Sequence, residues 1–273
     1  MRLCGDRHAA ARRRVPQGVI NQVVEHSLEE CNIAIDHRRR RDDFRLEQVP
    51  TPQPGPGEVL VRNHYLSLDP YMRGRMEESK SYAEPQKIGD TMIGGTVGVV
   101  ESSHHAGLVA GDTVVGLLGW QEYGVVSGRQ LMKVDTRAVP MSAYLGPVGM
   151  PGVTAWYGLN RICEPKPGET VLVSAASGAV GSVVGQLAKQ AGCRAIGIAG
   201  GPDKCEYVVS ELGFDACLDH RQFTDVKSMV RALREVAPQG VDGLFENVGG
   251  VCLDAAVACM NPFGRIALCG LIA

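Results

Sequence analysis

The segment 171–185 constrains the fold of this chain most strongly. It reads VLVSAASGAVGSVVG, in which apolar residues precede a glycine-containing turn and a helical pattern follows it. Ala176, Gly178 and Gly181 occupy the three glycine positions of a G-x-G-x-x-G sequence, with alanine at the first. Gly178 would let the backbone approach a pyrophosphate, and Gly181 would let the helix pack closely on the strand. The order strand, turn and helix predicts a nucleotide-binding unit; a tight turn that binds nothing is the alternative interpretation.

The sequence after residue 170 alternates between short apolar runs and amphipathic stretches. Strands are expected at 171–173, 194–199, 216–218, 242–246 and 265–271. Helices are expected from the glycine turn to residue 189, and at 203–212, 223–236 and 252–260. Continuous apolar strands that alternate with helices are typical of a parallel sheet covered on both faces. Residues 151–273 are therefore predicted to form a nucleotide-binding α/β domain.

The preceding part of the chain is expected to form a separate β domain. Between residues 44 and 150, glycine and proline separate short apolar runs. Strands are expected at 58–66, 93–100, 112–118 and 123–126. Several short strands with such punctuation favour a barrel-like domain, which we place at residues 42–150.

Residues 1–41 form an atypical basic segment. They contain nine arginines and five acidic residues, whereas the whole chain has a net charge of -2. The overall charge argues against a nucleic-acid-binding protein. We expect this segment to be a disordered or marginally helical extension; the alternative is an arginine-rich module that binds nucleic acid or anionic lipid.

The cysteines and the hydropathy pattern bear on the cellular compartment. The nine cysteines are odd in number, and no two of them form a C-x-x-C sequence. This pattern favours a reducing cytoplasm over a disulfide framework. No apolar run approaches the roughly 20 residues of a membrane span, and the N-terminus has no apolar segment of a secretory signal. No membrane association is therefore expected.

The end of the second strand distinguishes the two nicotinamide cofactors. NAD-binding enzymes usually carry an acidic residue there for the ribose 2′-hydroxyl. Here the strand ends in Ala199, Gly200 and Gly201, and Lys204 follows where its ammonium could meet a 2′-phosphate. His220 and Arg221, after the third strand, could lie near the same spot, whereas Asp203 would serve NAD if it pointed inward. The balance of these residues favours NADPH.

Four motifs resemble one family of reductases. These are LSLDPYMRGRM at 66–76, GMPGVTAWYGL at 149–159, the glycine turn, and FENVGG at 245–250. Together they resemble the zinc-independent medium-chain reductases, which include leukotriene B4 dehydrogenase/prostaglandin reductases, plant alkenal double-bond reductases and bacterial curcumin reductase. The resemblance extends from about residue 44 to residue 273. It implies a GroES-like β-barrel domain followed by a Rossmann-like, doubly wound parallel sheet.

The resemblance also implies roles for particular residues. The pyrophosphate would lie on the turn formed by Ala176, Gly178, Ala179, Val180 and Gly181. Lys204 would contact the 2′-phosphate beside Gly200, with His220 standing where the family often has a tyrosine. The remaining assignments are Asn247 at the nicotinamide, Cys269, Gly270 and Leu271 at its ribose, Met150 and Thr154 along the approach to the ring, and Tyr71 at the substrate pocket. No zinc ligands are expected, because the positions of the zinc-binding relatives read Leu-Asp-Pro and Gly-Gly-Thr here.

The activity that the resemblance implies is NADPH-dependent reduction of the C=C bond of α,β-unsaturated aldehydes and ketones, with hydride transferred to the β-carbon. A homodimer is expected on the same basis. In the family the chain continues past the fifth strand with a Tyr-Asn segment and a sixth strand, so we expect an incomplete, truncated nucleotide-binding domain. The alternatives are a zinc-free quinone reductase and a truncated, non-catalytic NADPH-binding protein.

Overall fold

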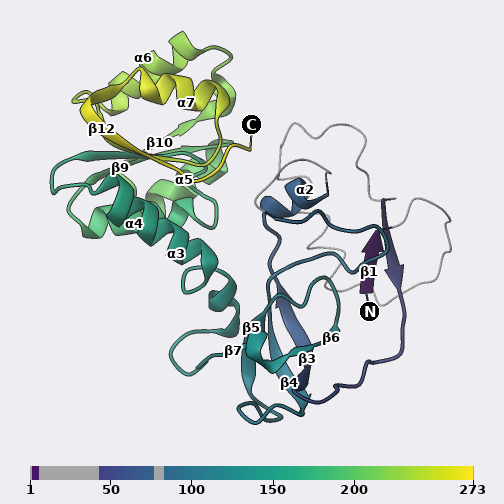
Figure 1. Cartoon of the computed structure of the whole chain (residues 1–273). Helices are drawn as coiled ribbons and strands as arrows, with labels where there is room; N and C mark the ends of the chain where they lie inside the picture. The colour runs from purple at the N-terminus through teal and green to yellow at the C-terminus, as the bar shows by residue number, and fades with distance from the viewer. Residues whose placement is uncertain (1, 6–42, 77–82, 273) are drawn as a thin grey trace. The chain divides into compact units, whose positions relative to one another are not determined.

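The computed structural model describes residues 2–5, 43–76 and 83–272. The chain divides into two compact units, Met1–Leu145 and Gly146–Ala273 (Figure 1), and each is described by itself. The division lies slightly before the boundary expected after residue 150. Most of the basic N-terminal segment, and with it the expected disorder, lies outside the described residues. Its beginning differs from expectation, because Arg2–Gly5 forms strand β1, which pairs antiparallel with β2 (Phe44–Glu47).

The first unit is built on a five-stranded antiparallel sheet with the order β6-β3-β4-β5-β7. Its strands are β3 (Glu58–Leu66), β4 (Thr96–Ser103), β5 (Thr113–Gly116), β6 (Tyr123–Ser127) and β7 (Met132–Lys133). Strand β3 shifts register twice against the central strand β4, and such bulges bend a sheet. Apolar side chains from β3, β4 and β5 are buried together, among them Val59, Val61, Val100 and Val114. The expected β domain is thus present.

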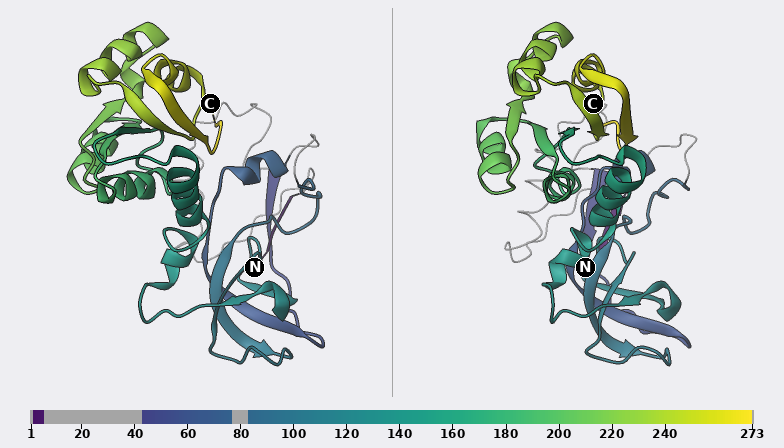
Figure 2. Two further views of the ribbon diagram at one scale, coloured as in Figure 1. Left: turned by 60° about the vertical axis from the view of Figure 1, so that its left-hand side comes forward. Right: turned by 90° about the vertical axis from the view of Figure 1, so that its left-hand side faces the viewer.

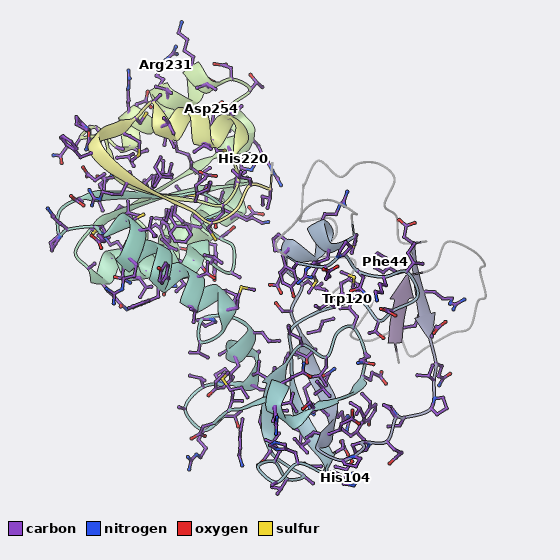
Figure 3. The ribbon with its side chains drawn as sticks, viewed as in Figure 1. Phe44, His104, Trp120, His220, Arg231 and Asp254 are labelled. Carbon is purple, nitrogen blue, oxygen red and sulfur yellow. The ribbon has the colours of Figure 1, made fainter. Side chains whose placement is uncertain are left out.

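A second apolar cluster of this unit surrounds a short helix, α2 (Tyr71–Arg75). Its buried members are Met72, Met92 and Trp120. Phe44 stacks on Trp120 with ring centroids 5.6 Å apart and 16° between the planes, and Figure 3 labels both side chains. Tyr71 packs against this cluster and is half-buried.

The second unit is a doubly wound α/β fold. Its five strands are all parallel, in the order β10-β9-β8-β11-β12. They are β8 (Thr170–Val173), β9 (Arg194–Ala199), β10 (Ala216–Asp219), β11 (Val241–Glu246) and β12 (Met260–Leu268). The chain begins in the middle of this sheet with β8, proceeds to one side, and then returns to the other side with β11. The strand order therefore reverses between β8 and β11, which is where open α/β sheets bind ligands.

Helices cover both faces of this sheet (Figures 1 and 2). They are α3 (Met150–Tyr157), which continues into the π-helical turn η4 (Gly158–Cys163), α4 (Gly181–Gln190), α5 (Pro202–Ser210), α6 (Val226–Val236) and α7 (Gly250–Val257). One core cluster joins the sheet to α3, α4 and α5, and includes Val173, Val184 and Phe245. The other joins it to α6 and α7, and includes Leu172, Met229 and Leu244. The strands are buried on both faces, which explains their continuous apolar runs.

The elements of this unit agree with the predicted alternation, although the boundaries of the last strand differ. β12 begins at Met260 and ends at Leu268, whereas a strand at 265–271 is expected from the sequence. It ends early because the N–H groups of Cys269 and Gly270 both donate to the carbonyl oxygen of Glu246, which turns the chain out of the ladder. Leu271 consequently lies beyond the strand.

Replacement of the fully buried Leu244 by alanine should destabilise the second unit, because it leaves a cavity between the sheet and α7. We expect a loss of about 2–5 kcal/mol in the free energy of unfolding. Val153→Ala is the matched control, since Val153 in the same unit is 65% exposed and should change the free energy by less than about 0.5 kcal/mol. Urea unfolding followed by circular dichroism measures both; equal losses would contradict the assignment of this core.

Candidate functional site

Most of the predicted cofactor residues lie just after the carboxyl ends of the five parallel strands, which all end on the same side of the sheet. The turn after β8 carries Gly178, Gly200 follows β9, and His220 follows β10. Asn247 follows β11, and Cys269 follows β12. The site is therefore assembled from five loops that are distant in the sequence.

The turn between β8 and α4 offers free backbone donors. Ala175 has a positive φ of 48°, and the N–H of Gly178 donates to the Ala175 carbonyl oxygen at 2.9 Å. Among the hydrogen bonds of the described residues, none uses the N–H groups of Ala179, Val180 and Gly181. These groups stand at the N-terminus of α4, where the helix dipole is positive, so they suit an anion such as a pyrophosphate.

Gly181 is required by the approach of the helix to the turn. A Cβ at this position would lie 2.3 Å from the Ala175 carbonyl oxygen, whereas one at Gly178 would lie 3.1 Å from the same atom. Ala176 differs from its neighbours. Its side chain is fully buried, and its N–H donates to the Ile198 carbonyl oxygen at 3.0 Å, so its donor is already engaged within the fold.

A cationic group surrounds the end of β9. An added Cβ at Gly200 would lie 2.9 Å from Nε2 of His220 and 3.3 Å from Nε of Arg221. Gly201 has a φ of 100°, and an added Cβ there would lie 3.2 Å from Nη1 of Arg221. The imidazole and the guanidinium therefore lie directly against these glycines, and Lys204 is in the first turn of α5, which follows. We name the basic residues Lys204, His220 and Arg221 the cationic cluster, after the charges of Lys204 and Arg221; Figure 3 labels His220.

Asp219, the last residue of β10, stabilises the backbone around the cationic cluster. Its Oδ1 accepts from the N–H of Gly201 at 2.8 Å and from the N–H of Arg221 at 3.0 Å. The bonds from Gly201 and Arg221 hold the pKa of the Asp219 carboxyl below its usual range. Asp219 thus stays ionised and joins the turn after β9 to the turn after β10.

The loops after β8 and β11 are joined through Asn247. Its backbone N–H donates to Ser174 Oγ at 2.7 Å, and its Nδ2 donates to the Ser174 carbonyl oxygen at 2.8 Å. The fully buried Glu246 uses Oε1 to accept from the N–H groups of Val248 and Gly249, both at 2.6 Å. The amide of Asn247 is consequently fixed in orientation at the point where the strand order reverses.

The residues after β12 lie beside this loop. The N–H groups of Cys269 and Gly270 donate to the Glu246 carbonyl oxygen at 2.8 and 3.1 Å, so these two donors are engaged. A Cβ at Gly270 would lie 3.0 Å from the Asn247 carbonyl oxygen. Leu271 follows and is 62% exposed. The structure therefore brings these predicted ribose residues next to Asn247.

Three predicted residues are not part of this group. Met150 and Thr154 lie in α3, which packs beside α4. Met150 is exposed and Thr154 is half-buried, and Thr154 Oγ1 donates to the Met150 carbonyl oxygen at 2.8 Å. Tyr71 belongs to the other unit, where it packs on the cluster around α2.

Several supporting residues were not predicted as site residues from the sequence. Ser174, Asp219 and Glu246 have no predicted contact with the cofactor. Their hydrogen bonds hold the loops that carry the predicted residues. Arg221 was noted near the cofactor and was not assigned to it. Their common signal is their position, because each lies within three residues of the end of a predicted strand.

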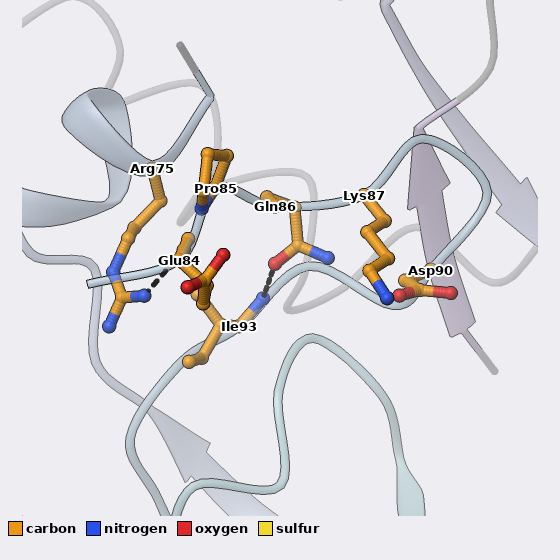
Figure 4. A pocket seen from close by; sticks show the side chains of 7 residues that line it. All are labelled: Arg75, Glu84, Pro85, Gln86, Lys87, Asp90 and Ile93. Carbon is orange, nitrogen blue, oxygen red and sulfur yellow. Dashed lines mark hydrogen bonds between the residues drawn. The ribbon is translucent and has the colours of Figure 1, made fainter. Parts of the chain in front are cut away.

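A small pocket of about 160 Å³ lies in the first unit (Figure 4). It is lined by Arg75, Glu84, Pro85, Gln86, Lys87, Asp90 and Ile93. In it Arg75 donates to the Glu84 carbonyl oxygen, and Gln86 Oε1 accepts from the N–H of Ile93 at 3.0 Å. None of the predicted site residues lines it, and we assign it no role.

Within the described ranges, no three His, Cys, Asp or Glu side chains are grouped so that they could hold a metal ion. The same ranges contain no helix that is long and apolar enough to cross a membrane.

The parallel sheet, the free donors at α4 and the cationic cluster are typical of a dinucleotide-binding domain. Two family models match the chain: the N-terminal domain of oxidoreductase over residues 35–134, and zinc-binding dehydrogenase over residues 179–273. Together with the relatives described next, they show that the chain belongs to the zinc-independent medium-chain dehydrogenase/reductase family.

Three relatives illustrate the similarity. NADPH-dependent curcumin reductase of Escherichia coli is 47% identical over 85% of this chain and 66% of that protein. NADP-dependent 2-alkenal reductase of Nicotiana tabacum is 45% identical over 80% of this chain and 63% of that protein. Prostaglandin reductase 1 of Bos taurus is 45% identical over 84% and 68%. The chain therefore spans about two thirds of the length of these relatives.

A solved structure gives the same result for the fold. The chain is similar to CurA from Vibrio vulnificus in complex with NADPH, with a TM-score of 0.80 and 47% identity. The match covers 85% of this chain and 68% of that chain. The predicted family and the predicted fold class are thus confirmed.

Replacement of Gly181 by valine should weaken nucleotide binding, because its side chain would displace the start of α4 from the turn. We expect the Kd for NADPH to rise at least about tenfold, since the free N–H groups at the start of α4 would move with the helix. Titration calorimetry measures the affinity, and circular dichroism checks that the variant is folded. The control is Gly74→Ala, since an added Cβ there has no neighbour within 4 Å; a folded Gly181→Val protein that binds as tightly as the control would refute this role.

Proposed function

We propose that the chain carries the NADPH-binding part, and part of the substrate-binding part, of a reductase of α,β-unsaturated aldehydes and ketones. The observation that supports this most is the combination of free backbone donors at α4 with the cationic cluster at the end of β9. A pyrophosphate and a 2′-phosphate are the two anions that such a pair would hold. The names of the relatives supply the substrate class, because curcumin and 2-alkenals are conjugated carbonyl compounds.

We assign a proposed role to each loop at the carboxyl ends of the parallel strands. The N–H groups of Ala179, Val180 and Gly181 would bind the pyrophosphate, and Gly178 leaves room for its approach. Gly200 would lie under the adenosine ribose, with Lys204, His220 and Arg221 around the 2′-phosphate. The imidazole and the guanidinium here would replace the tyrosine that the family often uses at the position of His220.

The nicotinamide end would lie at the reversal of strand order. Asn247, oriented by Ser174, would contact the carboxamide, and Cys269, Gly270 and Leu271 would border the ribose. Met150 and Thr154 would line the approach to the ring, and Tyr71 of the other unit would contact the substrate. Ala176 would support the turn from the core rather than donate to a phosphate, since its N–H is already engaged.

NADPH, when bound, supplies the hydride, which is transferred to the β-carbon of the conjugated carbonyl compound. The protein orients the two reactants and holds the cofactor's phosphates, which reduces the entropic part of the barrier. We further propose a cytoplasmic homodimer that binds neither nucleic acid nor membrane. The free thiols of the described cysteines are consistent with a reducing compartment.

The test is NADPH oxidation by the purified full chain with a medium-length 2-alkenal, with cofactor binding measured in parallel. The expected result is alkenal-dependent turnover, with NADPH preferred over NADH and the saturated aldehyde as product. A C4-deuterated cofactor should place deuterium on the β-carbon. Turnover with quinones alone would favour a zinc-free quinone reductase, and binding without any turnover would favour a non-catalytic NADPH-binding protein.

Replacement of Arg221 by alanine should weaken NADPH and spare NADH, because only NADPH carries the 2′-phosphate that the guanidinium would bind. We expect the Kd for NADPH to rise about tenfold to a hundredfold, as for the loss of a charge-assisted hydrogen bond. Arg231→Ala is the matched control, because it also removes one arginine charge. Arg231 is an exposed residue of α6 and is labelled in Figure 3. Equal effects of both variants on NADPH would mean that only long-range charge matters.

A further inference from the structure

Two thiols lie together beside the cationic cluster. The Sγ of Cys217 in β10 donates to the Sγ of Cys205 in α5 at 3.2 Å. Both side chains are half-buried, and both cysteines are free. Among the hydrogen bonds of the described residues, no other joins two cysteine sulfur atoms.

The pair connects the two segments that carry the cationic cluster. Cys205 directly follows Lys204 in the first turn of α5. Cys217 lies two residues before Asp219 and three before His220, and α5 packs against β10. A change in the distance between these sulfur atoms would therefore move the first turn of α5 relative to the residues after β10.

We propose that Cys205 and Cys217 form a reversible disulfide that weakens the binding of NADPH. The formation of the bond is independent of any cofactor, whereas its effect on affinity rests on the proposed function.

The geometry supports both parts of the proposal. A disulfide has an S–S distance of about 2.05 Å, so the sulfur atoms must approach by roughly 1.2 Å from their present 3.2 Å. Asp219 holds the N–H of Gly201 on the other side of the same turn. The approach would thus tilt the start of α5 about a fixed point and displace Lys204. A charge-assisted hydrogen bond to the 2′-phosphate weakens when its geometry changes by this much, and NADH lacks that phosphate.

The chemistry requires an oxidant, which we take to be a low-molecular-weight disulfide such as oxidised glutathione. The Cys205 thiolate attacks one of its sulfur atoms, which breaks that S–S bond and releases one small thiol. The Cys217 thiolate then attacks the Cys205 sulfur and releases the second small thiol. The protein loses two protons and two electrons, and the small disulfide gains both.

The order of the two steps follows from the surroundings of Cys217. Burial and the bond to Cys205 raise the pKa of the Cys217 thiol far above its usual range. The hydrogen bond that Cys217 Sγ donates would stabilise a thiolate at Cys205, so Cys205 attacks first and Cys217 is the resolving partner. Formation of the bond should therefore accelerate as the pH rises.

The experiment uses the full chain, incubated with oxidised glutathione and then alkylated and digested without reductant. Mass spectrometry should find a peptide that links Cys205 to Cys217 and disappears after treatment with dithiothreitol. In the oxidised protein the Kd for NADPH should rise about threefold to tenfold, whereas the Kd for NADH should change less than about twofold. Reduction should restore the original affinity.

Three variants control this experiment. Cys205→Ser and Cys217→Ser should each lack the linked peptide and the redox response, while their reduced forms bind NADPH as the reduced wild type does. Cys259→Ala is the control, since it removes a different thiol of the same unit and should keep both properties.

Alkylation of both thiols after oxidation, or their linkage to other cysteines, would overturn the proposal. A linked peptide with unchanged NADPH affinity would overturn its second half alone. Failure of the reduced chain to bind NADPH would instead refute the proposed function, and the linked peptide would still test the disulfide.

Discussion

The close approach of α4 to the turn after β8 is the contact on which the rest of the site depends. Gly181 lets the helix begin so near the Ala175 carbonyl oxygen that any side chain would collide with it. Because the helix begins there, the N–H groups of Ala179, Val180 and Gly181 remain free at its N-terminus. The N–H of the buried Ala176 donates to the carbonyl oxygen of Ile198, which joins the turn to β9. Backbone donors that suit an anion thus arise from packing, without any charged side chain.

The charged part of the site is built by a different means. The cationic cluster lies against Gly200 and Gly201, and the ionised Asp219 fixes the backbone on both sides of it. The Asp219 carboxylate accepts from two backbone N–H groups, and no hydrogen bond of the described residues joins it to the side chain of His220 or Arg221. In the proposed site, affinity for the dinucleotide and preference for the 2′-phosphate would therefore depend on different residues.

The sequence predicted the parts of this structure that depend on local residues. The strand, turn and helix of 171–185 were predictable because their pattern lies within one short segment. The hydrogen bonds between Ser174 and Asn247 were not predictable, because the two residues are 73 positions apart and nothing in a serine or an asparagine indicates that the other is its partner. The end of β12 was misplaced for the same reason, because the Glu246 carbonyl oxygen ends it. Strand β1 was missed because its four residues, RLCG, are too few to show an alternating pattern and its partner, β2, lies far along the chain.

The residues proposed to bind the cofactor's phosphates and the residue proposed to contact the substrate lie in different units of the chain. Every group proposed to hold a phosphate lies between Ala176 and Arg221, within the second unit, and depends on that unit's own core. Tyr71, the residue proposed to contact the substrate, belongs to the first unit and depends on the cluster around Trp120. Interactions that hold the cofactor equally in the ground state and the transition state change affinity and leave the chemical step unaffected. Variants at Gly181 and Arg221 should therefore act on cofactor affinity, whereas variants at Tyr71 should act on the use of substrate.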